Sequence, residues 1–334
     1  MLKRVGIKVI HQSRIPELVT LLKDRFEVFA PQEKDKEVVF SEVSDPGKIV
    51  LHYQTTVLPP KTFFLPPKET LFTVKGKKVT ASAPPKPFVL FGLHLKDLLG
   101  ICELDEIMRH EPKDSFYFKR RNKAVIIAAS GNEVGVPPGG DLVLEKIEGF
   151  YRAIAPTKAG QKIASLPVFE TRNIDLKPKP KKMSKLDEML LDSELLARSV
   201  EWSRENYPQI WQRLEKLCIN CGICTYVCPL CYCFEVEDQK SLDGSSCSRC
   251  RLWSACTLPS FAKIAGGHNF RPTVKERYFN WYYHKFVRAY KEFGRAQCVA
   301  CGRCQKYCPA GIDIENVLGE IVEEFQKAHP KREF

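Results

Sequence analysis

Apolar residues in the first half of the chain form short continuous runs separated by a helical periodicity. Residues 87–94 (PFVLFGLH) and 123–130 (KAVIIAAS) have the length and branched content of buried strands. Between them, residues 95–108 place their apolar side chains on one helical face. This succession predicts a sheet with at least one crossover connection. Residues 58–71 contain two Pro-Pro pairs and predict an extended surface connection.

The second half of the chain has a mainly helical pattern. Residues 186–217, 273–293 and 311–330 each carry helical periodicity or composition and flank cysteine-rich segments. Residues 176–186 (LKPKPKKMSKL) are basic, polar and proline-containing, and they predict a linker.

The predicted fold class is therefore α+β. We expect an N-terminal α/β-type domain over residues 1–175, then the linker over 176–186. A mainly helical domain follows over 187–334, and it contains an insert at 229–297.

Cysteine spacing supplies the chemistry of the helical domain. The chain has 14 cysteines, of which only Cys102 lies in the first half. The run C-x2-C-x2-C-x3-C-P occurs twice, starting at Cys218 and again at Cys298. In such a run three thiolates hold one cubane iron–sulfur cluster, and the fourth reaches a second cluster. Two complete copies predict a pair of [4Fe–4S] clusters that transfer electrons, in a helical two-cluster ferredoxin domain.

The spacing also assigns ligands, because the fourth cysteine of each run crosses to the other cluster. The expected ligands of cluster 1 are Cys218, Cys221, Cys224 and Cys308. The expected ligands of cluster 2 are Cys298, Cys301, Cys304 and Cys228.

Five further cysteines lie inside the insert. They suggest a third metal site, for which a third [4Fe–4S] cluster, a zinc ion and simple packing of the thiols are the alternatives. The expected ligands are Cys231, Cys247, Cys250 and Cys256, with Cys233 as the alternate to Cys231.

Charge and hydropathy limit the other classes of function. The formal net charge is +12, and two clusters of charge near −2 would bring the loaded protein to roughly +8. No nucleic-acid-binding motif accompanies this surplus, so we expect no nucleic-acid partner. No segment reaches the roughly 20 apolar residues of a membrane span, and no secretion signal is recognisable, so we expect a cytoplasmic protein without a membrane partner.

Longer segments resemble a known family. CGICTYVCPLCYCFEVEDQKSLDG, IAGGHNFRPT and CVACGRCQKYCPAGIDI are similar to the β subunit of cytoplasmic nickel–iron sulfhydrogenases of heat-loving archaea, to which one component of anaerobic sulfite reductases is related. HYQTTVLPPKTFFLPPKETLF extends the resemblance into the first half. It implies a non-catalytic subunit that passes electrons between a hydrogenase small subunit, paired with a large subunit, and a flavin subunit that binds NAD(P), in a heterotetramer. Some relatives also reduce sulfur.

The chain departs from this family in its first half. Family members commonly carry a cysteine in an H-x-C-D segment and more cysteines in a later loop, whereas this chain reads HLKD at 94–97 and AASGNEVG at 128–135. Cys102 is offset from the first of these positions. We therefore expect no cluster in residues 1–175.

Two other functions fit the same cysteines. In the first, the relay belongs to an anaerobic sulfite reductase or to a flavin complex linked to heterodisulfide reductase. In the second, redox-silent clusters stabilise a scaffold or a nucleic-acid-binding protein. The neighbouring subunits distinguish the relays from one another, and the ability of the clusters to accept electrons distinguishes both from the scaffold.

Overall fold

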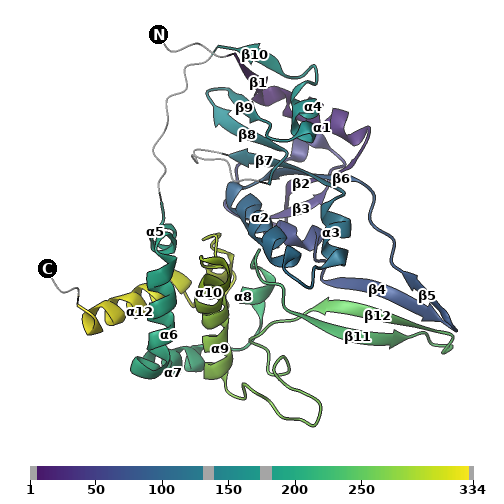
Figure 1. Ribbon diagram of the computed structural model, residues 1–334. Coiled ribbons are helices and arrows are strands. Elements are labelled where there is room, and N and C mark those ends of the chain that lie inside the picture. The colour runs from purple at the N-terminus through teal and green to yellow at the C-terminus, as the bar shows by residue number, and fades with distance from the viewer. Residues whose placement is uncertain (1–5, 131–138, 174–182, 331–334) are drawn as a thin grey trace. The chain divides into compact units, whose positions relative to one another are not determined.

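The structure is a computed structural model, and it describes residues 6–130, 139–173 and 183–330 (Figure 1). Contacts divide the chain into two compact units. Unit 1 combines Met1–Leu65 with Ala83–Lys182, and unit 2 combines Pro66–Ser82 with Met183–Phe334.

Segment Pro66–Ser82 differs from the expected domain organisation. The sequence boundary near residue 175 placed it in the N-terminal domain, whereas its contacts group it with the C-terminal unit. The predicted linker at 176–186 lies mostly outside the described residues, which resume at Met183.

A mixed sheet forms the centre of unit 1. Its described strands are β1 Ile7–His11, β2 Glu27–Lys34, β3 Glu37–Glu42, β6 Phe88–Leu93, β7 Ala124–Ser130, β8 Leu142–Ile147, β9 Phe150–Ile154 and β10 Glu170–Arg172. These eight strands lie in the order β10-β1-β9-β8-β7-β6-β2-β3. The β2–β6, β6–β7 and β7–β8 pairs are parallel, and the other pairs are antiparallel.

The helices of unit 1 connect these strands. They are α1 Ile15–Lys23, α2 Leu95–Arg109, α3 Ser115–Arg121 and α4 Lys158–Ala164, with short 3-10 turns η1 Gln12–Arg14, η2 Pro46–Lys48 and η3 Pro60–Phe63. Because β6 and β7 are parallel, α2 and α3 form the crossover between them. The predicted strand, helix and strand over residues 87–130 are thus confirmed.

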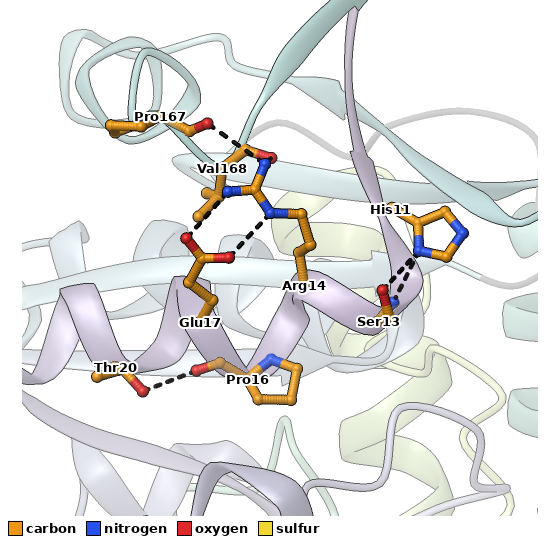
Figure 2. Close-up of polar contacts among 8 residues, drawn as sticks. All are labelled: His11, Ser13, Arg14, Pro16, Glu17, Thr20, Pro167 and Val168. Atoms are coloured by element: carbon orange, nitrogen blue, oxygen red, sulfur yellow. Dashed lines mark hydrogen bonds and ion pairs between the residues drawn. The ribbon is translucent and has the colours of Figure 1, made fainter.

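The start of α1 is tied to the segment after α4 by one arginine (Figure 2). Nε and Nη2 of Arg14 donate to the two carboxylate oxygens of Glu17 at 2.8 and 2.9 Å. Its Nη1 donates to the carbonyl oxygens of Pro167 and Val168 at 3.4 and 3.3 Å. The planar guanidinium can serve both sets of acceptors because its donors form a rigid fork.

The prediction of an extended surface connection at 58–71 was wrong. Phe64 and Leu65 are buried, and η3 precedes them. The ring of Phe63 lies 6.0 Å from Phe88, and that of Phe64 lies 5.8 Å from Tyr117. Aromatic burial outweighs the extended preference of the Pro-Pro pairs here.

A second sheet belongs to unit 2. Its described strands are β4 Lys68–Lys75, β5 Lys78–Ala81, β11 Phe234–Lys240 and β12 Ser246–Trp253. They pair antiparallel in the order β11-β12-β4-β5. A buried ion pair joins the central strands, since Arg251 Nη2 lies 2.6 Å from Glu69 Oε2. The insert therefore forms a hairpin, which the mainly helical prediction for this domain missed.

The described helices of unit 2 lie in sequence between strands β5 and β11 of this sheet or after β12. They are α5 Lys185–Leu191, α6 Ser193–Asn206, α7 Pro208–Leu217, α8 Ile223–Tyr226, α9 Val274–Tyr282, the π-helical segment η4 Tyr283–Arg288, α10 Ala289–Phe293, α11 Arg303–Lys306 and α12 Ile314–Ala328. The helical stretch at 186–217 is broken twice. Asp192 accepts a hydrogen bond as the N-cap of α6, and Pro208 starts α7, where its missing N–H costs nothing.

Aromatic side chains fill the core of unit 2. The Trp211 ring meets those of Phe279 and Tyr282 edge-on, at centroid distances of 5.0 and 5.3 Å. Its indole N–H donates to Ser203 O at 3.2 Å. In the part of the chain that the structure describes, no helix is both long and apolar enough to cross a membrane. The mixed sheet domain and the helical C-terminal domain agree with the predicted fold class.

Candidate iron–sulfur centres

Both cysteine runs fold into the same loop. Asn220 and Ala300, each two residues after the first cysteine of its run, adopt left-handed conformations with φ of 56° and 48°. Their backbone N–H groups are hydrogen-bonded to the sulfurs of Cys218 and Cys298. The repeated strain is stored at equivalent places in the two loops, which is typical of sites where function requires the geometry.

The repeat continues into two one-turn helices. Gly222 and Gly302 both have φ of 75°, which glycine adopts without strain. They precede α8 and α11. Each helix contains the third cysteine of its run, and the fourth follows two residues after the helix ends. The internal repeat in the sequence is therefore a structural repeat as well.

Two cavities lie beside these loops. The cysteines on the first cavity are Cys218, Cys221, Cys224, Cys304 and Cys308. The cysteines on the second cavity are Cys228, Cys298, Cys301 and Cys304. Each fourth cysteine, Cys228 or Cys308, faces the cavity of the other run. Cys304 contributes to the wall of both cavities.

Comparisons with known proteins agree with this geometry. A family of 4Fe-4S dicluster domains matches residues 217–312. The chain is 30% identical to "Sulfhydrogenase 2 subunit beta" of Pyrococcus furiosus over 336 residues, which covers 94% of this chain and 98% of that protein. The chain belongs to the sulfhydrogenase β-subunit family. No solved structure matches it.

The chain holds two [4Fe–4S] clusters, as its dicluster domain and its sulfhydrogenase β-subunit family indicate. These clusters supply reversible one-electron chemistry, so the chain is an iron–sulfur electron-transfer protein. This confirms the resemblance, the cofactors and the electron transfer that the sequence predicted.

The cysteine thiols that line the two cavities of this β-subunit family member are suitable ligands for [4Fe–4S] clusters. Among the described residues, no group of three or more His, Cys, Asp or Glu side chains converges on a single ion. The thiols instead surround a space, as ligands of a cube do. Burial raises the pKa of Cys224 to about 12 and that of Cys298 to about 11. Buried thiols of this kind become thiolates only when iron supplies the positive charge.

One helical stretch lies beside both cavities. Tyr278 and Trp281 line the first cavity, and Lys285, farther along the same stretch, lines the second. Tyr282 is fully buried. Burial raises the pKa of its hydroxyl, and negative charge on Cys304 and Cys224 raises it further. The stretch runs through α9 into η4, so π-helical geometry occurs where the chain reaches the second cavity.

Sequence reasoning missed Lys285. Its Nζ donates to Cys228 Sγ at 3.3 Å and to Gln297 O at 2.7 Å, and the residue is 5% exposed. Burial opposes the charge, but the nearby sulfurs of Cys228 and Cys231 outweigh burial and raise the pKa of Lys285. A signal existed: Lys285 follows Tyr278 by seven residues, a spacing that keeps both on one face of a helix.

The structure does not bring the insert cysteines together as one site. Cys247 and Cys250 lie on β12, whose pairing with β11 is regular through both. Residues three apart on a strand face opposite sides, so these two thiols cannot bind the same metal. Cys250 Sγ instead lies 3.7 Å from both Gln239 Oε1 and Thr70 Oγ1. The four-cysteine set for a third site stays a prediction, and β12 directs two of its members to opposite faces.

The other insert cysteines lie near the main runs. The thiol of Cys231 is hydrogen-bonded to Cys228, and that of Cys256 to Cys233. Cys256 is buried, and Cys233 packs against the same hydrophobic core. Cys231 therefore touches a ligand expected for cluster 2, and hydrogen bonds to cluster ligands influence cluster potentials.

Replacing Cys247 or Cys250 with alanine is expected to leave the iron content unchanged at about eight atoms per chain, two cubes of four. The reason is that β12 directs these thiols to opposite faces. Iron and acid-labile sulfide, measured on anaerobically prepared protein, would check this. A wild-type content of about twelve irons that falls to about eight in either variant would instead support the third cluster.

Cys102 in unit 1 has a packing role. It lies on α2, and its Sγ would be 2.5 Å from a Cβ atom added at Gly139, which has φ of 102°. Burial, followed by the charge of Asp105, raises the pKa of the Cys102 thiol to about 12. Cys102 is thus a neutral thiol packed against the backbone near Gly139.

Proposed function

We propose that this chain relays electrons between the small subunit of a nickel–iron hydrogenase and a flavin subunit that exchanges them with NAD(P). The observation that carries the proposal is the pair of cavities, one lined by five cysteines and the other by four, that share Cys304 and one helical stretch. Two adjacent one-electron sites suit a carrier between two-electron chemistries, because hydrogen and nicotinamide each exchange electrons in pairs.

The relative's name supports a multi-subunit setting, since it designates a β subunit of a sulfhydrogenase. We infer that this chain also works within a heteromeric complex, with the large, small and flavin subunits as partners. In this assignment Cys218, Cys221, Cys224 and Cys308 hold cluster 1, and Cys298, Cys301, Cys304 and Cys228 hold cluster 2. The exposed side chain of Cys221 supports electron exchange with a partner at cluster 1.

Purification through a tag on this chain is expected to recover nickel and flavin with the iron. Hydrogen gas should then reduce the clusters in the complex, and NAD(P)H should reduce them from the other side. Metal analysis, flavin absorbance and electron paramagnetic resonance (EPR) of the anaerobic complex are the measurements.

A complex that carries the double variant Cys228→Ala and Cys308→Ala serves as the control. It should keep hydrogen oxidation by an artificial dye at the hydrogenase subunits and lose hydrogen-dependent reduction of NAD(P). Sirohaem in place of nickel would overturn the hydrogenase assignment in favour of a sulfite reductase.

A further inference from the structure

The second cavity has a buried cation against a ligand sulfur. Lys285 Nζ lies 3.3 Å from Cys228 Sγ, and the residue is almost wholly removed from solvent. Gln297, directly before Cys298, accepts a second bond from Nζ at 2.7 Å and donates its own N–H to the carbonyl of Lys285 at 2.8 Å. This reciprocal pair fixes the ammonium group relative to ligands from both cysteine runs.

The first cavity has a different electrostatic environment. The same helical stretch lines it with the uncharged side chains of Tyr278 and Trp281, and Lys285 Nζ lies 5.4 Å from the centre of the Trp281 ring. Arg277 is a buried cation on this side: its Nη2 lies 3.3 Å from Asn220 Oδ1, and its charge partly offsets the burial that raises the pKa of Cys218. The other donors of Arg277 are held by carbonyls of Arg271, Pro272 and Thr257.

A fixed positive charge favours the reduced form of a cluster, because reduction adds one negative charge. The effect is larger where water is excluded, since the field is then less screened. Contact between Lys285 and Cys228 therefore stabilises the reduced form of cluster 2 more than that of cluster 1.

We propose that Lys285 sets the order of reduction, so that cluster 2 accepts an electron before cluster 1. The proposal rests on the two-cluster relay proposed above and deepens it. Lys285 is no iron ligand; it acts on the cluster through Cys228. The first electron that enters at the exposed edge, near Cys221, is then held at the more buried cluster. Cluster 1 stays oxidised and ready for the second electron.

The test is an EPR-monitored reductive titration of the anaerobic full-length chain. In Lys285→Met the higher of the two midpoint potentials should fall by at least about 59 mV, a tenfold change in a one-electron equilibrium. The lower potential should stay where it is. Lys285→Arg keeps the charge and should largely keep the order of reduction. Lys291→Met is the matched control, because Lys291 is a half-exposed lysine of the same helical stretch that pairs with Glu201.

A second measurement needs no variant. With 15N-labelled lysine in the wild-type chain, pulsed EPR should detect a lysine nitrogen coupled to the cluster that is reduced first. Coupling to the later-reduced cluster alone, or an unchanged higher potential in Lys285→Met, would overturn the proposal. These readouts concern the chain itself, so a complex without nickel would contradict the hydrogenase assignment and leave the order of reduction intact.

Discussion

Replacing Cys308 with alanine is expected to remove the cluster of the first cysteine run, although Cys308 belongs to the second run in sequence. Cys308 lines the same cavity as Cys218, Cys221 and Cys224. A cube that loses one of four thiolates is held weakly, so iron should fall from about eight to about four atoms per chain. Iron analysis and EPR of the reduced protein are the measurements.

Two further variants identify which cluster was lost. Cys221→Ser alters a ligand that lines only the first cavity, and Cys301→Ser one that lines only the second. The EPR signal missing in Cys308→Ala should be the one that Cys221→Ser changes. Cys228→Ala should give the reciprocal result with Cys301→Ser. If Cys308→Ala instead removes the signal that Cys301→Ser changes, the runs do not interleave.

Replacing Trp211 with alanine is expected to lower the free energy of unfolding of the C-terminal unit by about 3–5 kcal/mol. Trp211 is 2% exposed and packs against Phe279 and Tyr282. Its removal leaves a large cavity and takes the indole donor from Ser203 O. Denaturant unfolding followed by circular dichroism, at equal iron content, would measure the loss.

Trp202→Ala is the matched control. Trp202 is only partly buried, and its ring lies 5.6 Å from Phe325 and 5.8 Å from His329, near the end of α12. Its replacement should cost clearly less than that of Trp211. Equal losses in the two variants would mean that the Trp211 cluster is not the core of the unit.

Local sequence predicted elements well where apolar side chains fill a whole strand or one face of a helix. The run at 87–94 became β6, and the periodic segment at 95–108 became α2. Prediction failed at 58–71 because a buried aromatic cluster outweighed two Pro-Pro pairs. It also failed in the insert, where β11 is almost wholly exposed and its polar residues gave no apolar alternation to recognise.

By itself the sequence determined that this protein holds two iron–sulfur cubes, because cysteine spacing along the chain limits which sulfurs can reach one cluster. Only the tertiary structure decided what surrounds them. It placed Lys285 against Cys228, turned Cys247 and Cys250 to opposite faces of β12, and paired β4 with β12 although the two strands are far apart in sequence. These contacts join distant parts of the chain. They depend on packing and burial, which spacing in the sequence does not encode.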